Sequence, residues 1–524
     1  MSQIRIINLS FTYPGALEPV FQDVNLDLDS GWRLGLIGRN GRGKTTLLRL
    51  LCGELTGQGS IQADVAFEYF PQPVADPARP ALAVARQSIA PFDHWEAEMH
   101  RLAGEATPEA MDAYGDIEAA YAAADGYIID EVIAAEAGRL GIAGEALGRP
   151  FQSLSGGEKV KLLLAAAFLR KHSFLLIDEP TDHLDAEGRR RVAAWLAEKK
   201  GFILVSHDRA FLDASIDHVL SINRADIELQ RGGYTSWRQN RESRDNFERA
   251  QNQKLAGSIR RLSDAARQTE RWSDKIEATK IGGHVYDRGA VGAQAARMMK
   301  RSKAILNRRE AEIDQKKQLL KNIEENDPLV FHSLEAKKQL YVLAEDLSYS
   351  YGGGAVLNGL SLEVRAGDRI AVTGANGSGK STLLKLLAGS LPPQKGTLQR
   401  MPGLQVSGVD QELHGLRGSL KDYAALRGLD EPLFLALLRK LNFEREAFAR
   451  DIGSFSAGQK KKVGIAASLA QPAHLFIWDE PLNYIDVLSR EQIEDAVLES
   501  CPTMVFVEHD QAFVDRVATQ VLRL

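Results

Sequence analysis

Gly38-Arg39-Asn40-Gly41-Arg42-Gly43-Lys44-Thr45 decides the fold, and Gly374-Ala375-Asn376-Gly377-Ser378-Gly379-Lys380-Ser381 repeats it. Both stretches follow short apolar runs, residues 34–37 and 370–373, which read as strands, and both open a segment that reads as a helix. A Gly-x-x-x-x-Gly-Lys-Ser/Thr loop in this setting presents backbone N–H groups and the positive end of a helix dipole to phosphates. The sequence therefore predicts two phosphate-binding loops in α/β domains.

The repeat continues downstream of both loops. Ser155-Gly156-Gly157-Glu158 is matched by Ser456-Ala457-Gly458-Gln459, and Asp178-Glu179 is matched by Asp479-Glu480. The spacing from the serine to the aspartate is 23 residues in both copies. Such agreement indicates the duplication of one domain.

The two copies differ in length, and a charged segment separates them. The first copy holds about 35 additional residues, which we assign to 91–127 as a helical hairpin on the surface. Residues 235–325 carry 21 Lys and Arg against 13 Asp and Glu, a net charge of +8, with helical periodicity. A glycine-containing break at 282–289 predicts an antiparallel pair of helices.

Lysine, hydroxyl and acidic side chains supply the expected phosphate chemistry. Lys44 and Lys380 reach the β and γ phosphates. The hydroxyl groups of Thr45 and Ser381 would bind Mg²⁺, which an aspartate at the end of an apolar strand also holds. These aspartates are Asp178 and Asp479.

Each aspartate is followed by a candidate general base. Glu179 and Glu480 can orient and deprotonate the water that attacks the γ-phosphate. His207 and His509 lie 29 and 30 residues beyond the aspartates and are expected to contact the γ-phosphate and this water. A glutamate that only caps a turn, or a structural histidine, is the alternative.

A glutamine and an aromatic residue complete each predicted site. Gln72 and Gln411 follow the loops by similar distances and are expected to sense Mg²⁺ and the γ-phosphate, unless they are solvated surface residues. Tyr13 and Tyr351 each offer a face on which adenine can stack, although an aromatic at the end of a strand can also belong to the core. Tyr349 competes with Tyr351 for this role.

Composition indicates a globular chain. Apolar residues make up 44% of the 524 residues and charged residues 26%, which excludes a disordered chain. No apolar run is long enough to span a membrane, and the first residues lack the order of a signal peptide, so we expect a cytoplasmic protein. Cys52 and Cys501 lack ligand spacing, so we expect neither a disulfide framework nor a zinc site.

Together with the loops, Ser155-Gly156-Gly157-Glu158 resembles the signature of the ATP-binding cassette superfamily. The resemblance implies ATP hydrolysis with Mg²⁺ by two cassettes, residues 1–234 and 326–524, joined by the linker 235–325. It also implies that each ATP lies between the loop of one cassette and the signature of the other. The residues expected to contact nucleotide are Tyr13, Gly38, Asn40, Gly41, Gly43, Lys44, Thr45, Thr46, Gln72, Ser155, Gly156, Gly157, Glu158, Asp178, Tyr351, Gly374, Asn376, Gly377, Gly379, Lys380, Ser381, Thr382, Gln411, Ser456, Ala457, Gly458, Gln459 and Asp479. Of these, Thr45, Gln72, Asp178, Ser381, Gln411 and Asp479 are the metal candidates.

Two cassettes on one chain with a basic linker resemble the ABC-F proteins, which bind ribosomes. Residues 287–289, 295–303, 34–43 and 481–486 resemble the branch that protects ribosomes from lincosamides, streptogramin A and pleuromutilins. The resemblance implies ribosomal RNA and P-site tRNA as partners of the linker, no membrane or DNA partner, and a monomer whose cassettes pair with each other. A basic projection also suits an RNA cavity, because phosphate contacts would supply much of the affinity.

Three departures from the family pattern and four alternative interpretations remain open. Arg42, Ala457 and Glu508 replace the residues usual in the family, which hints at two unequal sites. The linker can be a solvated coiled coil without an RNA partner. The chain can also be a housekeeping translation factor, the motor of a transporter, or a DNA-repair ATPase, although the last would normally carry zinc-binding cysteines.

Overall fold

The computed structural model describes residues 3–15, 19–105, 107–181, 184–223, 226–279, 328–336, 338–352, 354–375, 377–411 and 417–524. Asn376 and the predicted linker break at 282–289 lie outside these ranges. Contacts divide the chain into two units, Met1–Thr235 with Asn326–Leu524, and Ser236–Glu325. The first unit contains two halves of the same α/β plan, as the duplicated sequence predicts.

The first half combines a small antiparallel sheet with a six-stranded sheet. The small sheet has the order β2-β1-β4, and the large sheet has the order β5-β6-β7-β3-β8-β9, in which only β9 runs antiparallel. Strands β6 and β7 are apolar, as expected for a parallel sheet that helices cover on both faces, and they are buried. The strands are β1 (Gln3–Phe11), β2 (Phe21–Asp29), β3 (Arg33–Gly38), β4 (Gln58–Gln62), β5 (Ala66–Phe70), β6 (Ser173–Asp178), β7 (Phe202–Val205), β8 (His218–Ile222) and β9 (Ile227–Arg231).

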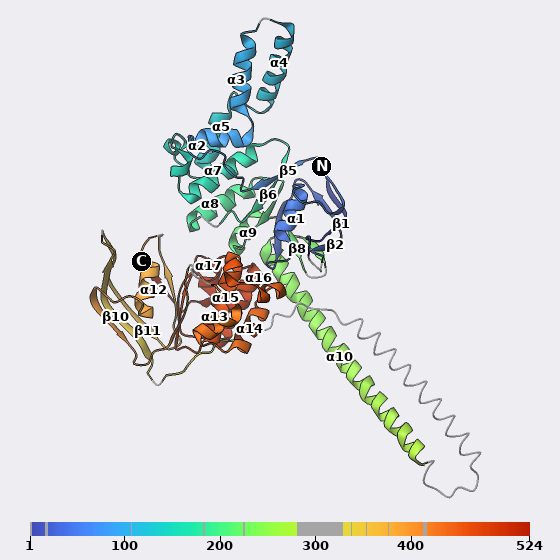
Figure 1. Ribbon diagram of the computed structural model, residues 1–524, viewed down its shortest axis with the longest axis vertical. Coiled ribbons are helices and arrows are strands. Elements are labelled where there is room, and N and C mark those ends of the chain that lie inside the picture. The colour runs from blue at the N-terminus through green and yellow to red at the C-terminus, as the bar shows by residue number, and fades with distance from the viewer. Residues whose placement is uncertain are drawn as a thin grey trace, which may run out of the picture. The chain divides into compact units, whose positions relative to one another are not determined.

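The helices of the first half begin where the sequence supplies caps. Ser155 caps α7 and exchanges hydrogen bonds with Glu158 in a capping box, and Asp185 caps α8. Helices α3 and α4 lie side by side and occupy the surplus residues of the first copy (Figure 1). The helices are α1 (Lys44–Leu51), α2 (Ala81–Ile89), α3 (Phe92–Ala103), α4 (Pro108–Ala123), α5 (Ile129–Arg139), α6 (Gly144–Leu147), α7 (Gly156–Leu169), α8 (Ala186–Ala197) and α9 (Arg209–Ser215), with a 3-10 turn at Phe151–Ser153.

The second half repeats both sheets. The small sheet has the order β11-β10-β13, and the parallel sheet has the order β14-β15-β16-β12-β17. The strands are β10 (Leu340–Ser350), β11 (Ala355–Arg365), β12 (Arg369–Thr373), β13 (Lys395–Arg400), β14 (Val406–Val409), β15 (Leu475–Asp479), β16 (Met504–Val507) and β17 (Gln520–Arg523). The helices are α12 (Lys380–Ala388), α13 (Leu420–Arg427), α14 (Glu431–Lys440), α15 (Ala457–Ala470), α16 (Val487–Ser500) and α17 (Gln511–Val517), with 3-10 turns at Arg445–Ala449 and Ile452–Ser454.

The first part of the linker is the helix α10 (Tyr234–Thr279), the long green helix of Figure 1. Ion pairs four residues apart support it, with Arg238 Nε 3.0 Å from Glu242 Oε1 and Arg241 Nε 3.8 Å from Asp245 Oδ2. Its 46 residues correspond to a length of about 70 Å at the rise of an α-helix. The linker therefore begins as one extended element.

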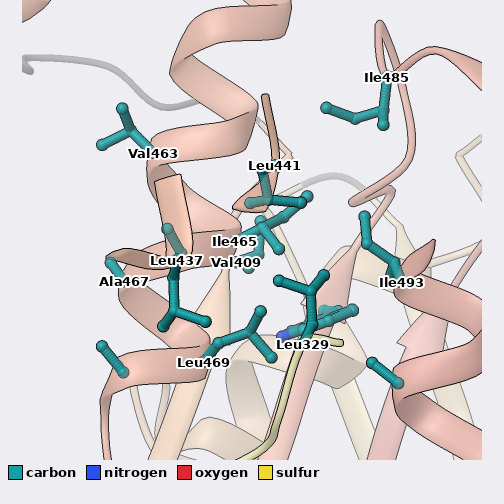
Figure 2. Close-up of a cluster of buried hydrophobic side chains, with 14 of the residues drawn as sticks. Leu329, Val409, Leu437, Leu441, Val463, Ile465, Ala467, Leu469, Ile485 and Ile493 are labelled. Carbon is teal, nitrogen blue, oxygen red and sulfur yellow. The ribbon is translucent and has the colours of Figure 1, made fainter. Parts of the chain in front are cut away.

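The first described residues after the linker belong to the core of the second half. Figure 2 shows Leu329 within a buried cluster that includes Leu441, Ile465 and Ile493. Leu329 is 1% exposed. Phe331, two residues further, stacks on Trp478 with ring centroids 5.5 Å apart. Leu329 and Phe331 therefore belong to the core of the second half.

Candidate functional site

The first glycine loop holds its lysine through backbone oxygens. Lys44 Nζ donates hydrogen bonds to the carbonyl oxygen of Gly38 at 2.7 Å and of Arg39 at 3.3 Å, and to Asn40 Oδ1 at 3.3 Å. Burial lowers the pKa of Lys44, which nearby carboxylates partly offset. The ammonium group is thereby placed at the N-terminus of α1, where phosphate oxygens are favoured.

The second loop has the same geometry. Lys380 Nζ donates to the carbonyl oxygen of Gly374 at 2.9 Å and of Ala375 at 3.0 Å. Gly379 must be glycine, because its φ is 96° and an added Cβ would lie 2.8 Å from Val356 Cγ1. The two loops are thus built alike within the described residues.

A hydroxyl group and a carboxylate meet beside the first loop. Thr45 Oγ1 donates a hydrogen bond to Asp178 Oδ2 at 3.2 Å. Tyr69 OH donates to the same oxygen at 2.8 Å, and burial together with the Asp178 charge raises the pKa of Tyr69. Tyr69 was not predicted from the sequence as part of the site, since a strand tyrosine gives no signal of its own.

The corresponding pair in the second half fits a divalent cation. Ser381 is hydrogen-bonded to Asp479, and burial raises the pKa of this aspartate. The Oδ1 atom of Asp479 is buried and has no hydrogen-bond partner among the described residues. A buried carboxylate oxygen requires a partner, and oxygen ligands are those that Mg²⁺ prefers.

The predicted base and histidine of the first half are in contact. His207 Nε2 lies 3.2 Å from Glu179 Oε1, and the His207 backbone N–H donates to Glu179 Oε2 at 3.2 Å. Glu179 has a φ of 49°, a strained conformation that its N–H bond to the carbonyl oxygen of Val205 at 2.9 Å supports. Burial lowers the pKa of His207 well below its usual value, so its ring is neutral.

The same pair recurs in the second half. His509 Nε2 lies 3.2 Å from Glu480 Oε1, and this hydrogen bond lowers the pKa of Glu480. Glu480 also has a positive φ, 47°, and its Oε2 accepts from Asn483 Nδ2 at 2.7 Å and from Gln411 Nε2 at 3.1 Å. An ionised carboxylate held in this way can accept a hydrogen bond from a water molecule.

Gln72 does not lie where the repeat predicts. Its Nε2 donates to Glu68 Oε2 at 2.8 Å, and its Oε1 accepts from Arg170 Nη2 at 3.0 Å. The side chain is absent from the cavity that Lys44 lines. Glu68 in β5 and Arg170 at the end of α7 bind this amide, whereas Gln411 reaches Glu480, the candidate base of its half.

The two predicted aromatic residues are accessible. Tyr13 is 40% exposed, and its hydroxyl lies 2.9 Å from Oγ1 of the buried Thr46. Tyr351 is 56% exposed and packs edge-on against Tyr349 at 5.0 Å. Each lines the cavity of its own loop, as adenine stacking requires.

The first cavity, about 780 Å³, is built from both halves. Besides the first loop, it is lined by the second signature, Ser456-Ala457-Gly458-Gln459. Asn40 of the first half contacts the second half directly, because its Nδ2 donates a hydrogen bond to the carbonyl oxygen of Tyr484 at 3.1 Å. Gly458 has no room for a side chain, since an added Cβ would lie 2.6 Å from that oxygen. The structure therefore brings the first loop and the second signature together.

Comparison with known families identifies this architecture. A family model described as ABC transporter matches residues 21–182 and 357–483. The chain belongs to this family. Cassette 1 denotes the first half and cassette 2 the second half from here on. The two cassettes with their phosphate-binding loops, aspartates and glutamates make the chain an ATPase.

The chain is similar over nearly its whole length to translation proteins. It is 27% identical to the energy-dependent translational throttle protein EttA of Haemophilus influenzae, over 96% of this chain and 88% of that protein. It is equally similar to EttA of Escherichia coli strain K12, over 96% of this chain and 89% of that protein. These similarities support the resemblance to ABC-F proteins.

Solved structures show the same fold. An archaeal ribosome recycling factor, in a crystal structure with a ribosomal stalk protein, matches with a TM-score of 0.56 and 19% identity, over 98% of this chain and 87% of that chain. An RNase-L inhibitor matches with the same values. Within the described residues of the present chain, no helix is sufficiently long and apolar to cross a membrane.

The second ATP site is not assembled in the same way. A cavity of about 560 Å³ is lined by Lys380, Ser381 and both glutamates, Glu179 and Glu480. The signature of cassette 1, residues 155–158, is not among its lining residues. Instead, cassette 1 contributes other residues to this cavity, among them Asp185, Arg189, His207 and Asp208. The first cavity is therefore lined by a signature segment, whereas the second cavity is not.

One departure from the family pattern has a structural explanation. Glu508, which precedes His509, is 6% exposed, and burial raises its pKa. Its Oε1 accepts from the backbone N–H of Leu482 at 2.8 Å, and its Oε2 accepts from the N–H of His509 at 2.9 Å. Glu508 thus links the histidine to the loop that follows Glu480.

Three further residues of the first site were not predicted from the sequence. Asp486 is fully buried, and its Oδ2 accepts from Lys462 Nζ at 3.3 Å and from the backbone N–H of Asn40 at 3.2 Å. Burial alone would raise the pKa of Asp486, but the ammonium groups of Lys462 and Lys44 lower it overall. Glu444 lines the cavity and accepts from Gln459 Nε2 at 3.1 Å.

Proposed function

We propose that this ATPase is an ABC-F protein that acts on the ribosome and regulates translation. The observation that carries the proposal is the pairing of two cassettes in one chain with a basic linker that begins as the 46-residue helix α10. The linker carries a net charge of +8, whereas the whole chain carries −5. A basic extended element fits an RNA partner, because each neutralised phosphate releases counterions.

The residues of the chain can perform hydrolysis as follows. Lys44 and Lys380 would hold the phosphates, and Asp178 and Asp479 with their hydroxyl partners would hold Mg²⁺. This ion would neutralise charge on the phosphate oxygens. Glu179 and Glu480 accept the proton of the attacking water, and the neutral ring of His207 orients the first of these carboxylates.

Closure of the cassettes would report the nucleotide state to the linker. The signature serine caps its helix, so the positive end of α15 points at the cavity of the first loop. Nucleotide bound there interacts with both cassettes, and hydrolysis removes part of that interaction. Ribosome binding then depends on ATP, and release from the ribosome depends on hydrolysis.

The test is the double variant Glu179→Gln with Glu480→Gln. ATP binding should persist, because the phosphate-binding loops are unchanged, while turnover should fall at least 100-fold, the usual effect of removing a general base. The variant should pellet with ribosomes in ATP and block translation in an extract. A matched control is the exposed pair Glu109→Gln with Glu118→Gln on α4. Undiminished hydrolysis in the double variant would overturn the catalytic assignment. Loss of hydrolysis without any pelleting with ribosomes in ATP would overturn the proposed function.

Protection of the ribosome from antibiotics is a finer proposal, supported by the resemblance of residues 287–289 and 295–303. Replacing Val285, Tyr286, Asp287 and Arg288 by a Gly-Ser loop should leave ATPase activity near wild type and abolish tolerance to a lincosamide or pleuromutilin. Expression of the unaltered chain in a sensitive host is the first measurement. No gain of tolerance there would leave the housekeeping translation role, and co-purification with a membrane subunit would favour a transporter motor. The same proposal includes a monomeric protein located in the cytoplasm.

A further inference from the structure

A buried ion cluster joins the two cassettes outside the phosphate-binding loops. Arg209 begins α9, directly after His207 and Asp208, and is 7% exposed. Its Nη2 donates a hydrogen bond to Oε2 of Glu494 on α16 of cassette 2 at 2.7 Å. Glu494 is fully buried, and Asp510 Oδ2 lies 3.7 Å from the same nitrogen. Arg209 of cassette 1 therefore enters a buried part of cassette 2 and meets two carboxylates there.

The two carboxylates have partners of their own in cassette 2. Glu494 Oε1 accepts from Arg516 Nη1 at 2.9 Å, and Asp510 Oδ2 accepts from Arg490 Nη1 at 3.3 Å. Removing Arg209 would therefore leave both carboxylates paired. By contrast, withdrawing the intact guanidinium from Glu494 would break a desolvated ion pair, which is costly.

Among the described residues, this contact is formed on one side of the pair of cassettes and has no counterpart on the other. Counted from the aspartates Asp185 and Asp486 that cap α8 and α16, the residue of cassette 1 that corresponds to Glu494 is Ala193. The residue of cassette 2 that corresponds to Arg209 is Gln511. An alanine and a glutamine cannot form an ion pair, so the duplicated domains hold one such contact instead of two.

The same face of α16 also binds the chain at the start of the linker. The hydroxyl of Tyr234, which is 2% exposed, donates to Glu491 Oε1 at 2.6 Å. Arg209 Nη1 lies 3.9 Å from this carboxylate oxygen. The cluster thus connects the histidine loop of cassette 1, the helix α16 and the last residues before the linker.

We propose that the Arg209–Glu494 ion pair is a permanent tether on one side of the interface, which keeps the first ATP site assembled before nucleotide binds. Arg209 is then a positioning residue for hydrolysis, because it fixes the loop that carries His207 against cassette 2. The assembled contact between the first loop and the second signature agrees with this role. Closure of the second site onto residues 155–158 would remain the step that requires ATP.

The test measures the distance between the cassettes without nucleotide. Spin labels on Glu54→Cys in cassette 1 and on the natural, exposed Cys501 in cassette 2, with Cys52→Ser, report this distance. Arg209→Gln should broaden the distribution, which should be narrow in the parent. The apparent KM for ATP should rise about three- to tenfold, because fewer molecules are competent to bind, with a smaller change in kcat. With Arg209→Lys, both the distance distribution and the apparent KM should lie between those of the parent and of Arg209→Gln.

Two controls separate tethering from general damage. Arg191→Gln removes an arginine of α8 whose ion pair with Glu187 is on the surface, and both measurements should stay at the parental values. Glu494→Gln should also broaden the distribution, although it removes the ion pair with Arg516 as well. Adding Arg209→Gln to Glu494→Gln should cause no further broadening, because the interaction that the two residues share is already lost. An unchanged distance distribution in Arg209→Gln, or additive effects in the double variant, would overturn the tether.

Discussion

The backbone nitrogen of Asn40 donates a hydrogen bond to Asp486 Oδ2 at 3.2 Å, although 446 positions separate the two residues. The same oxygen accepts from Lys462 Nζ at 3.3 Å. One buried carboxylate therefore holds the phosphate-binding loop of cassette 1 against the signature helix of cassette 2. The first ATP site depends on a charge that neither sequence motif contains.

The first prediction concerns this charge. Asp486→Asn should lower the free energy of unfolding by about 3–5 kcal/mol, because it leaves Lys462 as a buried cation without its carboxylate. ATPase activity should fall with it. Asp185→Asn is the matched control, since Asp185 caps α8 but is exposed, and asparagine is as good a cap as aspartate. Equal loss of stability in both variants, measured by thermal and denaturant unfolding, would contradict the role of the buried charge.

The second prediction separates the two composite sites. Ser456→Arg should disturb the contact between the cassettes even without nucleotide, because Ser456 lines the assembled cavity with Lys44. Ser155→Arg should leave the nucleotide-free contact intact and impair only ATP-dependent closure of the second site. A distance probe across each site, read with and without ATP, distinguishes these outcomes. Identical behaviour of the two variants without nucleotide would show that the sites are equivalent.

The phosphate-binding parts of the fold could be predicted from the sequence. A glycine loop, an apolar strand that ends in Asp-Glu and a capped signature helix are local motifs, because phosphate and metal chemistry restricts residues that are close in sequence. Their spacing in two copies was sufficient to place Lys44, Lys380, Glu179 and Glu480. The α/β class follows from the same motifs.

Contacts across the interface could not be predicted in this way. Lys462, Asp486 and Arg209 are charged residues that a sequence reading assigns to solvent, and only the packing of two distant segments buries them. The position of Gln72 departs from the repeat for a related reason. Its distance from the loop matches that of Gln411, but the side chains of Glu68 and Arg170 determine where its amide points.

The third prediction concerns the metal. Asp479→Asn should increase the Mg²⁺ concentration for half-maximal ATPase activity about 10- to 100-fold, the usual cost of disturbing a metal site. The reason is the buried Oδ1 atom of Asp479, which lacks a hydrogen-bond partner in the part of the chain that the structure describes and would be satisfied by the ion or its water. Activity is titrated with Mg²⁺ at fixed ATP. Asp495→Asn, on the surface of α16, serves as the control, and an unchanged Mg²⁺ requirement in Asp479→Asn would contradict the assignment.

The last prediction follows from the lowered pKa of His207 and concerns stability against pH. Burial keeps this ring neutral in the folded protein, while in the unfolded chain it takes up a proton below about pH 6.5. The unfolded state then binds more protons, so stability decreases as pH falls from about 7 toward 5, by up to about 1.4 kcal/mol per pH unit for this one group. His207→Gln should flatten this part of the curve, whereas His100→Gln, which removes an exposed histidine of α3, should retain the parental slope. Melting temperatures of the three proteins between pH 7 and 5 measure the effect. A slope in His207→Gln as steep as that of the parent would show that another group takes up the proton.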